Sequence, residues 1–142
     1  MTSSRKQQTI DYAALAAFRY EIRRFQNFSE KAAREAGIEP HQHQALLAIK
    51  GSPELDTTVG ALAERMQIRH HSAVELSRRL EARGWIRRSR NVHDRREVQL
   101  RLTPRAEKLL VTLSLAHRNE LRTAEPRLSR ALARAVAGQR RR

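Results

Sequence analysis

A chain of 142 residues has room for one domain, or for one small domain joined to a dimerisation module, and its 39% hydrophobic residues allow only a lean core. Lysine and arginine total 29 against 15 acidic residues, and the net charge of +14 favours a polyanionic partner such as a phosphate backbone or, by charge alone, a membrane surface. The absence of cysteine excludes disulfides, thiolate metal sites and thiol redox sensing, and no apolar run approaches the ~20 residues that span a bilayer.

The N-terminal segment should be a short lead followed by one long helix. Residues 1–9 are polar, which predicts a disordered lead. They contain no secretory signal, so we expect a cytoplasmic protein that has no membrane partner. Asp11 is a candidate N-cap, and Gly37 ends the helical pattern. Apolar side chains recur in steps of three or four, at Tyr12, Leu15, Phe18, Ile22, Phe25 and Phe28. This stripe at residues 10–36 indicates a core or a dimer interface, with a ligand pocket as the alternative.

The next two helices are short. Pro40 suits a first helical turn, and the helix up to Lys50 should place Leu46, Leu47 and Ile49 inside. Leu55 is a candidate for a very short strand. Thr58 is a suitable N-cap for a helix that buries Val59, Leu62, Ala63 and Met66.

A helix from His70 to Arg83 follows a break at residues 67–69. It should bury Ala73, Leu76 and Leu80 and end at Gly84. Two amphipathic helices around a tight turn suggest a helix-turn-helix, although any helical hairpin shows this pattern.

A strand hairpin is predicted next. Residues 85–88 form a candidate strand and residues 91–94 a turn, after which Val98, Leu100 and Leu102 alternate with polar residues. Two helices followed by a hairpin with a charged tip form a winged helix, which we assign to residues 39–103. The fold class expected is therefore mainly α (α+β), a winged helix-turn-helix between N- and C-terminal dimerisation helices.

The C-terminal segment, residues 104–138, is expected to hold two further helices. Thr103 and Pro104 begin one, whose apolar face contains Leu109, Leu110, Leu113 and Ala116. Pro126 is expected to begin a last helix, with Leu128, Leu132, Ala135 and Val136 on one side and Gly138 at its end. Residues 139–142 then form a basic tail. The outer helices cannot bury their stripes on so small a domain, so we expect them to pack across a two-fold axis as a dimer.

The predicted hairpin is rich in arginine. Residues 83–105 contain eight arginines and only two acidic residues, Asp94 and Glu97, which gives this segment a local charge of +6. A guanidinium is planar and weakly hydrated, so it can enter a narrow minor groove. The alternative is a solvated edge strand that carries charge against aggregation.

The outward face of the helix at 70–83 offers groups for base edges and phosphates. Val74 could contact a thymine methyl, Glu75 could accept a hydrogen bond from a cytosine amino group, and Arg78 could bind a phosphate. Alternatively, Glu75 forms an ion pair with Arg78 or Arg79. The complete set of predicted DNA-binding residues is Arg69, His70, His71, Ser72, Val74, Glu75, Arg78, Arg88, Arg90, Asp94, Arg95 and Arg96.

The segments at 58–66 and 70–84 resemble the DNA-binding lobe of MarR-family regulators, and residues 94–103 (DRREVQLRLT) resemble the family's wing signature D-x-R-x-x-x-x-x-L-T. The resemblance covers nearly the whole chain. Two features depart from it: Ala106 stands where many members have glycine, and the last helix is short and ends in polyarginine.

The resemblance implies a homodimer on a pseudopalindromic operator, where it would act as a repressor, with activation as the alternative. Arg96 then corresponds to the arginine that enters the minor groove, and Asp94 to the acidic residue that shapes the wing tip. Many members release DNA when a small aromatic or phenolic anion binds. Such an effector pocket would be lined here by Tyr20, His41, His43 and Trp85, which are otherwise ordinary packing residues.

Two other functions compete with this interpretation of the sequence. An enzyme is disfavoured because no phosphate loop or nucleophile elbow is present, and because the pairs His41-x-His43 and His70-His71 lack a third metal ligand at a sensible spacing, so neither a cofactor nor a metal is expected. A non-sequence-specific nucleic-acid binder is the closer rival, because it needs only the basic surface. RNA modules usually stack bases on aromatic side chains, and five of the six aromatic residues here lie at 12–28, away from the basic hairpin.

Overall fold

Five helices and three strands make up the part of the chain that the computed structural model describes, residues 9–52, 57–90, 92–94 and 96–138. In chain order they are α1 (Tyr12–Glu35), α2 (Pro40–Lys50), β1 (Thr57–Thr58), α3 (Val59–Met66), α4 (His70–Ala82), β2 (Ile86–Arg90), β3 (Val98–Leu102) and α5 (Pro104–Ala137). The predicted fold class is confirmed: the chain is mainly helical, with a small antiparallel sheet and a winged helix-turn-helix. Among these helices, none is both long enough and apolar enough to cross a membrane.

The chain divides into two compact units. Residues 1–29 and 117–142 form one, which we call the helical unit, and residues 30–116 form the other, which we call the winged unit. The predicted disordered lead, except for Thr9, and the predicted basic tail at 139–142 lie outside the described residues.

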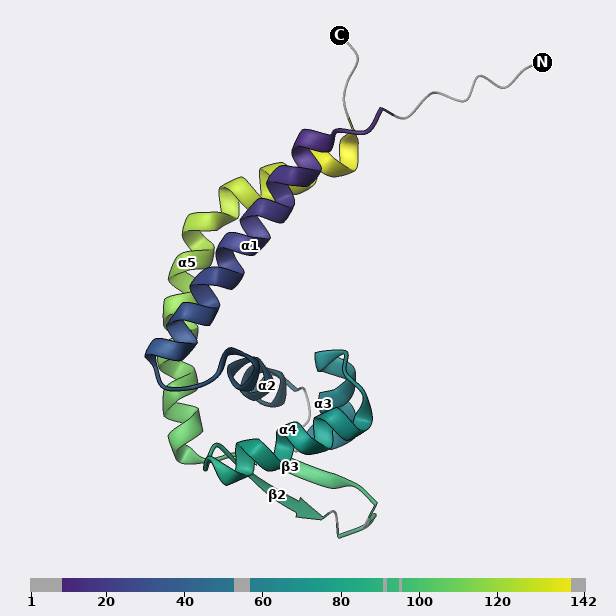
Figure 1. The fold of residues 1–142 in the computed structure, drawn as a ribbon, viewed down its shortest axis with the longest axis vertical. Coiled ribbons are helices and arrows are strands. Elements are labelled where there is room, and N and C mark those ends of the chain that lie inside the picture. The colour runs from purple at the N-terminus through teal and green to yellow at the C-terminus, as the bar shows by residue number, and fades with distance from the viewer. Residues whose placement is uncertain (1–8, 53–56, 91, 95, 139–142) are drawn as a thin grey trace, which may run out of the picture. The chain divides into compact units, whose positions relative to one another are not determined.

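In the helical unit, α1 and α5 run side by side (Figure 1). Asp11 caps α1 as predicted, because its carboxylate accepts a hydrogen bond from the first turn at 2.9 Å. Arg134 of α5 also reaches Asp11 at 3.5 Å, and Arg127 reaches Glu21 at 3.1 Å. Both carboxylates are buried, so their pairing with arginines of α5 offsets the loss of water and holds the two helices together.

The predicted aromatic stripe of α1 is only partly covered within one chain. Phe25 and Phe28 pack edge-on against His117 of α5, with ring centroids 5.8 and 5.4 Å away. In contrast, Tyr12 and Leu15 are 73% and 42% exposed. The first two turns of α1 therefore keep an apolar face that is open to a further partner.

The predicted break at Pro126 is wrong, because α5 continues through it and is one helix of 34 residues. Proline removes one backbone hydrogen bond and costs about 3 kcal/mol inside a helix. Contacts on both sides of it keep the helix intact: Ala124 and Ala131 are buried, and Arg127 pairs with Glu21. The prediction of a short last helix, which followed from a start at Pro126, is therefore also wrong.

The core of the winged unit receives hydrophobic side chains from each of its helices and from β2 and β3. Its largest fully buried hydrophobic residues are Leu46, Leu62, Leu80, Ile86 and Leu100. The predicted inner positions of α3 and α4 are confirmed, although Met66 is only partly buried. In α2 the prediction for Leu47 is wrong: it is 51% exposed, and His43 and Gln42 are buried instead. An 11-residue helix has only one inner face, and Leu47 lies about 100° around the axis from Leu46.

The helix-turn-helix forms as predicted. The Thr58 hydroxyl accepts a hydrogen bond from the backbone of Ala61 at 3.1 Å and so begins α3. Gln67 ends α3 in the left-handed conformation at φ 53°, and α4 begins at His70. Gly84, at φ 76°, then turns the chain from α4 into the hairpin, a conformation that glycine adopts at little cost.

The sheet has three strands in the order β1-β3-β2: the two strands of the predicted hairpin, and a two-residue strand close to the very short one predicted at Leu55. β2 and β3 pair antiparallel from Ile86↔Leu102 to Arg90↔Val98, and β1 pairs with the other edge of β3. The first predicted strand was one residue early, because Trp85 is a buried residue that precedes β2. Leu55 lies outside the described residues.

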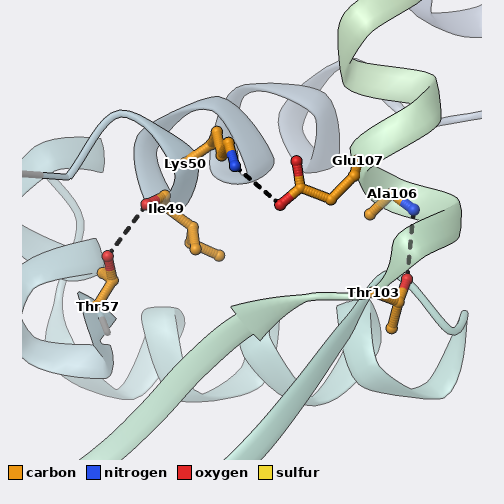
Figure 2. A network of polar contacts seen from close by, with 6 residues as sticks. All are labelled: Ile49, Lys50, Thr57, Thr103, Ala106 and Glu107. Atoms are coloured by element: carbon orange, nitrogen blue, oxygen red, sulfur yellow. Dashed lines mark hydrogen bonds and ion pairs between the residues drawn. The ribbon is translucent and has the colours of Figure 1, made fainter. Parts of the chain in front are cut away.

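Polar contacts join α2 to β1 and to α5, and join Thr103, the residue directly after β3, to the first turn of α5 (Figure 2). The Thr103 hydroxyl accepts from the backbone of Ala106 at 3.3 Å, as expected of an N-cap, and donates to the carbonyl of Gly84 at 2.8 Å. Lys50 and Glu107 form an ion pair at 3.0 Å, and the Thr57 hydroxyl donates to the carbonyl of Ile49 at 3.2 Å. The contacts of Thr103 fix the point at which the hairpin passes into α5.

Candidate nucleic-acid interface

Half of the twelve residues predicted to bind DNA lie on α4. His70, His71, Glu75 and Arg78 are exposed, as is Arg69 just before the helix, whereas Ser72 and Val74 are partly buried. No side chain caps the first turn of α4, so backbone N–H groups at its N-terminus are available to an anion. The helix therefore presents hydrogen-bonding side chains and a positive end together.

Glu75 forms an ion pair with Arg78, which was the alternative to its predicted role in binding DNA. Its carboxylate lies 3.5 Å from the guanidinium of Arg78, one turn along α4. Both side chains are more than half exposed, so the pair contributes little to stability and does not hold either group against a stronger partner. Arg78 can turn to a phosphate while Glu75 turns to a base.

The turn that joins β2 to β3 is shaped by Asp94. Its carboxylate accepts a hydrogen bond from the backbone N–H of Arg96 at 3.0 Å, and its carbonyl accepts one from Glu97 at 3.1 Å. Asp94 thus shapes the hairpin tip, and the Arg96 side chain is exposed. Arg90 is exposed and Arg88 is partly buried, while the predicted residue Arg95 lies outside the described residues.

A groove of about 170 Å³ lies where α3, α4 and the hairpin meet. It is lined by Thr58, Val59, Gly60, His70, Val74, Arg96, Glu97 and Val98. His70 from the start of α4 and Arg96 from the hairpin thus face one space, although 26 residues separate them in the sequence. Thr58 and Gly60 were missed as site residues, and only their position at a helix N-terminus could have indicated them.

The four residues predicted to line an effector pocket are distributed differently. His43 and Trp85 are buried in the winged unit, where Arg105 lies 4.0 Å above the Trp85 ring, and His41 is exposed on α2. Tyr20 belongs to the helical unit and is 56% exposed. Trp85 and His43 therefore have packing roles, and neither lines the groove described above.

Metal binding finds no support in the described ranges, which contain no group of three or more histidine, aspartate or glutamate side chains placed to hold an ion. The neighbouring His70 and His71 are both exposed near the start of α4. The chemistry of this surface is that of hydrogen bonding and positive charge.

Comparisons with known proteins agree with this description. Residues 36–97 match the model of the MarR family, whereas no curated protein matches the chain. Its fold is similar to that of AbsC, a MarR family transcriptional regulator from Streptomyces coelicolor, with a TM-score of 0.69, 18% identity and coverage of 79% of this chain and 76% of that one. It is also similar to a MepR variant from S. aureus bound to an oligodeoxyribonucleotide (TM-score 0.65, 20% identity, coverage 80% and 81%). BpsR from Bordetella bronchiseptica, whose DNA binding is regulated by 6-hydroxynicotinic acid, is a third such structure (TM-score 0.62, 18% identity, coverage 80% and 79%).

Proposed function

We propose, from the match of residues 36–97 to the model of the MarR family, that the chain is a DNA-binding transcriptional regulator that acts as a homodimer on a pseudopalindromic operator. The observation that carries the proposal is the groove in which the start of α4 and the arginine of the hairpin meet. We propose that α4 enters the major groove and that Arg96 enters the adjacent minor groove. The proposal includes no catalytic activity and places the protein in the cytoplasm.

Homodimerisation is proposed from the exposed apolar residues of the helical unit. Large hydrophobic side chains that a compact monomer would normally cover are exposed there: Ile10, Tyr12, Leu15, Tyr20, Leu121, Leu132 and Val136. A second copy of the same unit offers the same residues, so a two-fold contact would cover both sets at once. Residues 10–36 and 104–138 are in this proposal dimerisation helices, and residues 39–103 are the DNA-binding lobe.

Dimerisation sets the form of the operator. Two copies of α4 related by a two-fold axis read an inverted repeat whose half-sites lie about 10 bp apart, one turn of the duplex. A dimer bound over a promoter excludes polymerase, and we therefore propose repression.

A small aromatic or phenolic anion is proposed as the effector that releases DNA. The support is the similarity to BpsR, whose DNA binding is regulated by 6-hydroxynicotinic acid. Titration of that compound into the protein–DNA complex tests the idea directly. A release that is half complete at micromolar to millimolar concentration supports it, and an unchanged complex contradicts it for this compound.

Selection of bound duplexes from random DNA is the experiment that tests the main proposal. A specific dimer enriches one inverted repeat with a fixed spacing between its halves. The alternative, a non-sequence-specific nucleic-acid binder that uses its basic surface, recovers random sequence and shows no two-fold footprint. Enrichment of a single site without symmetry would contradict the dimer while leaving specific binding intact.

The Arg96→Ala variant should bind the selected duplex about 1–3 kcal/mol more weakly, because a guanidinium in the minor groove is lost. Fluorescence anisotropy across a salt series measures this loss together with the number of phosphate contacts. The matched control is Arg122→Ala, which removes the same charge from an exposed position of the helical unit. Equal losses in both variants would show that charge alone is responsible, and wild-type affinity of Arg96→Ala would remove the hairpin from the interface.

A further inference from the structure

The hairpin is held to α4 by a side chain as well as by the chain itself. β2 is one of the two edge strands of the sheet, so alternate N–H groups along it face away from its neighbour β3. One of these, the backbone N–H of Arg88, donates a hydrogen bond to the carboxylate of Glu81 at 2.8 Å. Glu81 lies in the last turn of α4, seven residues earlier in the sequence. The contact therefore connects α4 with the middle of β2.

The position of Glu81 is unfavourable for the helix alone. The C-terminal end of a helix carries a partial negative charge, which disfavours a carboxylate in its last turn. A residue that breaks a local rule commonly has a role elsewhere in the fold. Here the Arg88 N–H gives the carboxylate a hydrogen-bond donor that offsets this cost.

Glu81 and Arg88 line a second groove, of about 270 Å³, between α4 and β2. Arg78 and Arg90 line it as well, so three arginines and Glu81 share this groove. Removal of Glu81 thus takes away both a hydrogen-bond acceptor and a negative charge near the proposed DNA surface. An experiment must separate these two effects.

We propose that Glu81 is a positioning residue that fixes the hairpin relative to α4, so that α4 and Arg96 can enter their two grooves at once; this inference rests on the proposed function. A hairpin arm of about six residues is about 20 Å long, so a swing of about 10° at Ile86 moves its tip by about 3.5 Å, more than half of the ~6 Å minor-groove width. The bond at Arg88 resists that swing and shortens the free arm to about two-thirds of this length.

Four variants and a double variant test the proposal on the selected duplex. Glu81→Ala should bind about five- to tenfold more weakly, the size of one lost hydrogen bond that holds a contact in place. Glu81→Gln, which keeps an acceptor oxygen, should stay within about threefold of the wild type. The matched control Glu64→Ala removes the same charge from an exposed position of α3 and should change affinity by less than about twofold. In the Arg96→Ala background, Glu81→Ala should have almost no further effect.

A footprint provides the readout that a purely structural role would not change. Hydroxyl-radical protection of the flanking minor groove should disappear in Glu81→Ala, while protection of guanine N7 in the major groove remains. Independent, multiplying losses from Glu81→Ala and Arg96→Ala would overturn the inference, as would a glutamine variant as weak as the alanine variant. If Arg96→Ala itself binds like the wild type, the proposed minor-groove contact fails first, and the inference fails with it.

Discussion

Replacement of Leu80 by alanine is expected to lower the free energy of unfolding by about 2–5 kcal/mol. Leu80 is fully buried on the inner face of α4, and its backbone carbonyl accepts the hydrogen bond from Trp85 that turns the chain toward β2. Truncation leaves a cavity among rigid neighbours such as Leu46 and Ile86, which belong to the same core cluster. Because α4 is the helix proposed to read DNA, partial collapse of this core should also weaken specific binding.

Urea denaturation followed by circular dichroism measures the loss, at one fixed protomer concentration because a dimer couples stability to concentration. Leu47→Ala is the control: the same change on a helix of the same unit, but at a side chain that is 51% exposed. Its effect should stay below about 1 kcal/mol. Similar midpoints for the two variants would mean that the cluster around Leu80 is not the core of the winged unit.

The boundaries of helices were predictable from the sequence wherever they depend on local chemistry. Asp11, Thr58 and Thr103 each cap a helix through their own side chain, and Gly84 ends α4 with a positive φ. These signals act over three or four residues, so no knowledge of the packing is needed. The inner face of α4 was predictable for the same reason, because a period of 3.6 residues fixes it.

Features that depend on distant contacts could not be predicted. Pro126 is a correct local signal for a helix start, but contacts of α5 with α1 on either side of it outweigh the local cost. The sequence predicts a very short strand near Leu55, but two residues are too few to show an alternating pattern, so the bounds of β1 depend on its pairing with β3. Whether His43 lines a pocket or packs in the core depends on which face of α2 turns inward, and that face includes it.

In the candidate site, too, features that depend on local sequence were predictable and features that depend on distant contacts were not. The period of α4 indicated which of its residues point outward, and the charge of the hairpin indicated its arginines. The hydrogen bond of Glu81 with Arg88 joins two elements through a backbone N–H, a donor that every residue except proline has, so no pattern of residue types marks it. Likewise, Arg105 lies over Trp85 and donates to the carbonyl of Arg83 at 2.8 Å, across 22 residues of sequence.

A double variant, Leu15→Glu with Leu132→Glu, is expected to convert the protein to a monomer and to weaken binding to the selected duplex by about 100-fold to 10⁴-fold. Leu15 and Leu132 are 42% and 47% exposed on the two helices of the helical unit, where a second copy is proposed to cover them. A glutamate at a buried dimer interface must lose water without a prepared partner, so each substitution disfavours association. Once the protomers separate, each half-site is held by one copy alone, and the gain from joint binding is lost.

Sedimentation velocity and fluorescence anisotropy at the same protein concentrations separate the two halves of this prediction. Ala16→Glu with Ala133→Glu is the matched control, because it adds the same charges at neighbouring exposed positions that lie about 100° further around each helix. The control should remain dimeric and bind within a few-fold of the wild type. A dimer that persists in the leucine variant would place the interface elsewhere on the chain. Monomeric protein with unchanged affinity would instead show that one copy of α4 and its hairpin suffices, and the inverted repeat would then have no physical basis.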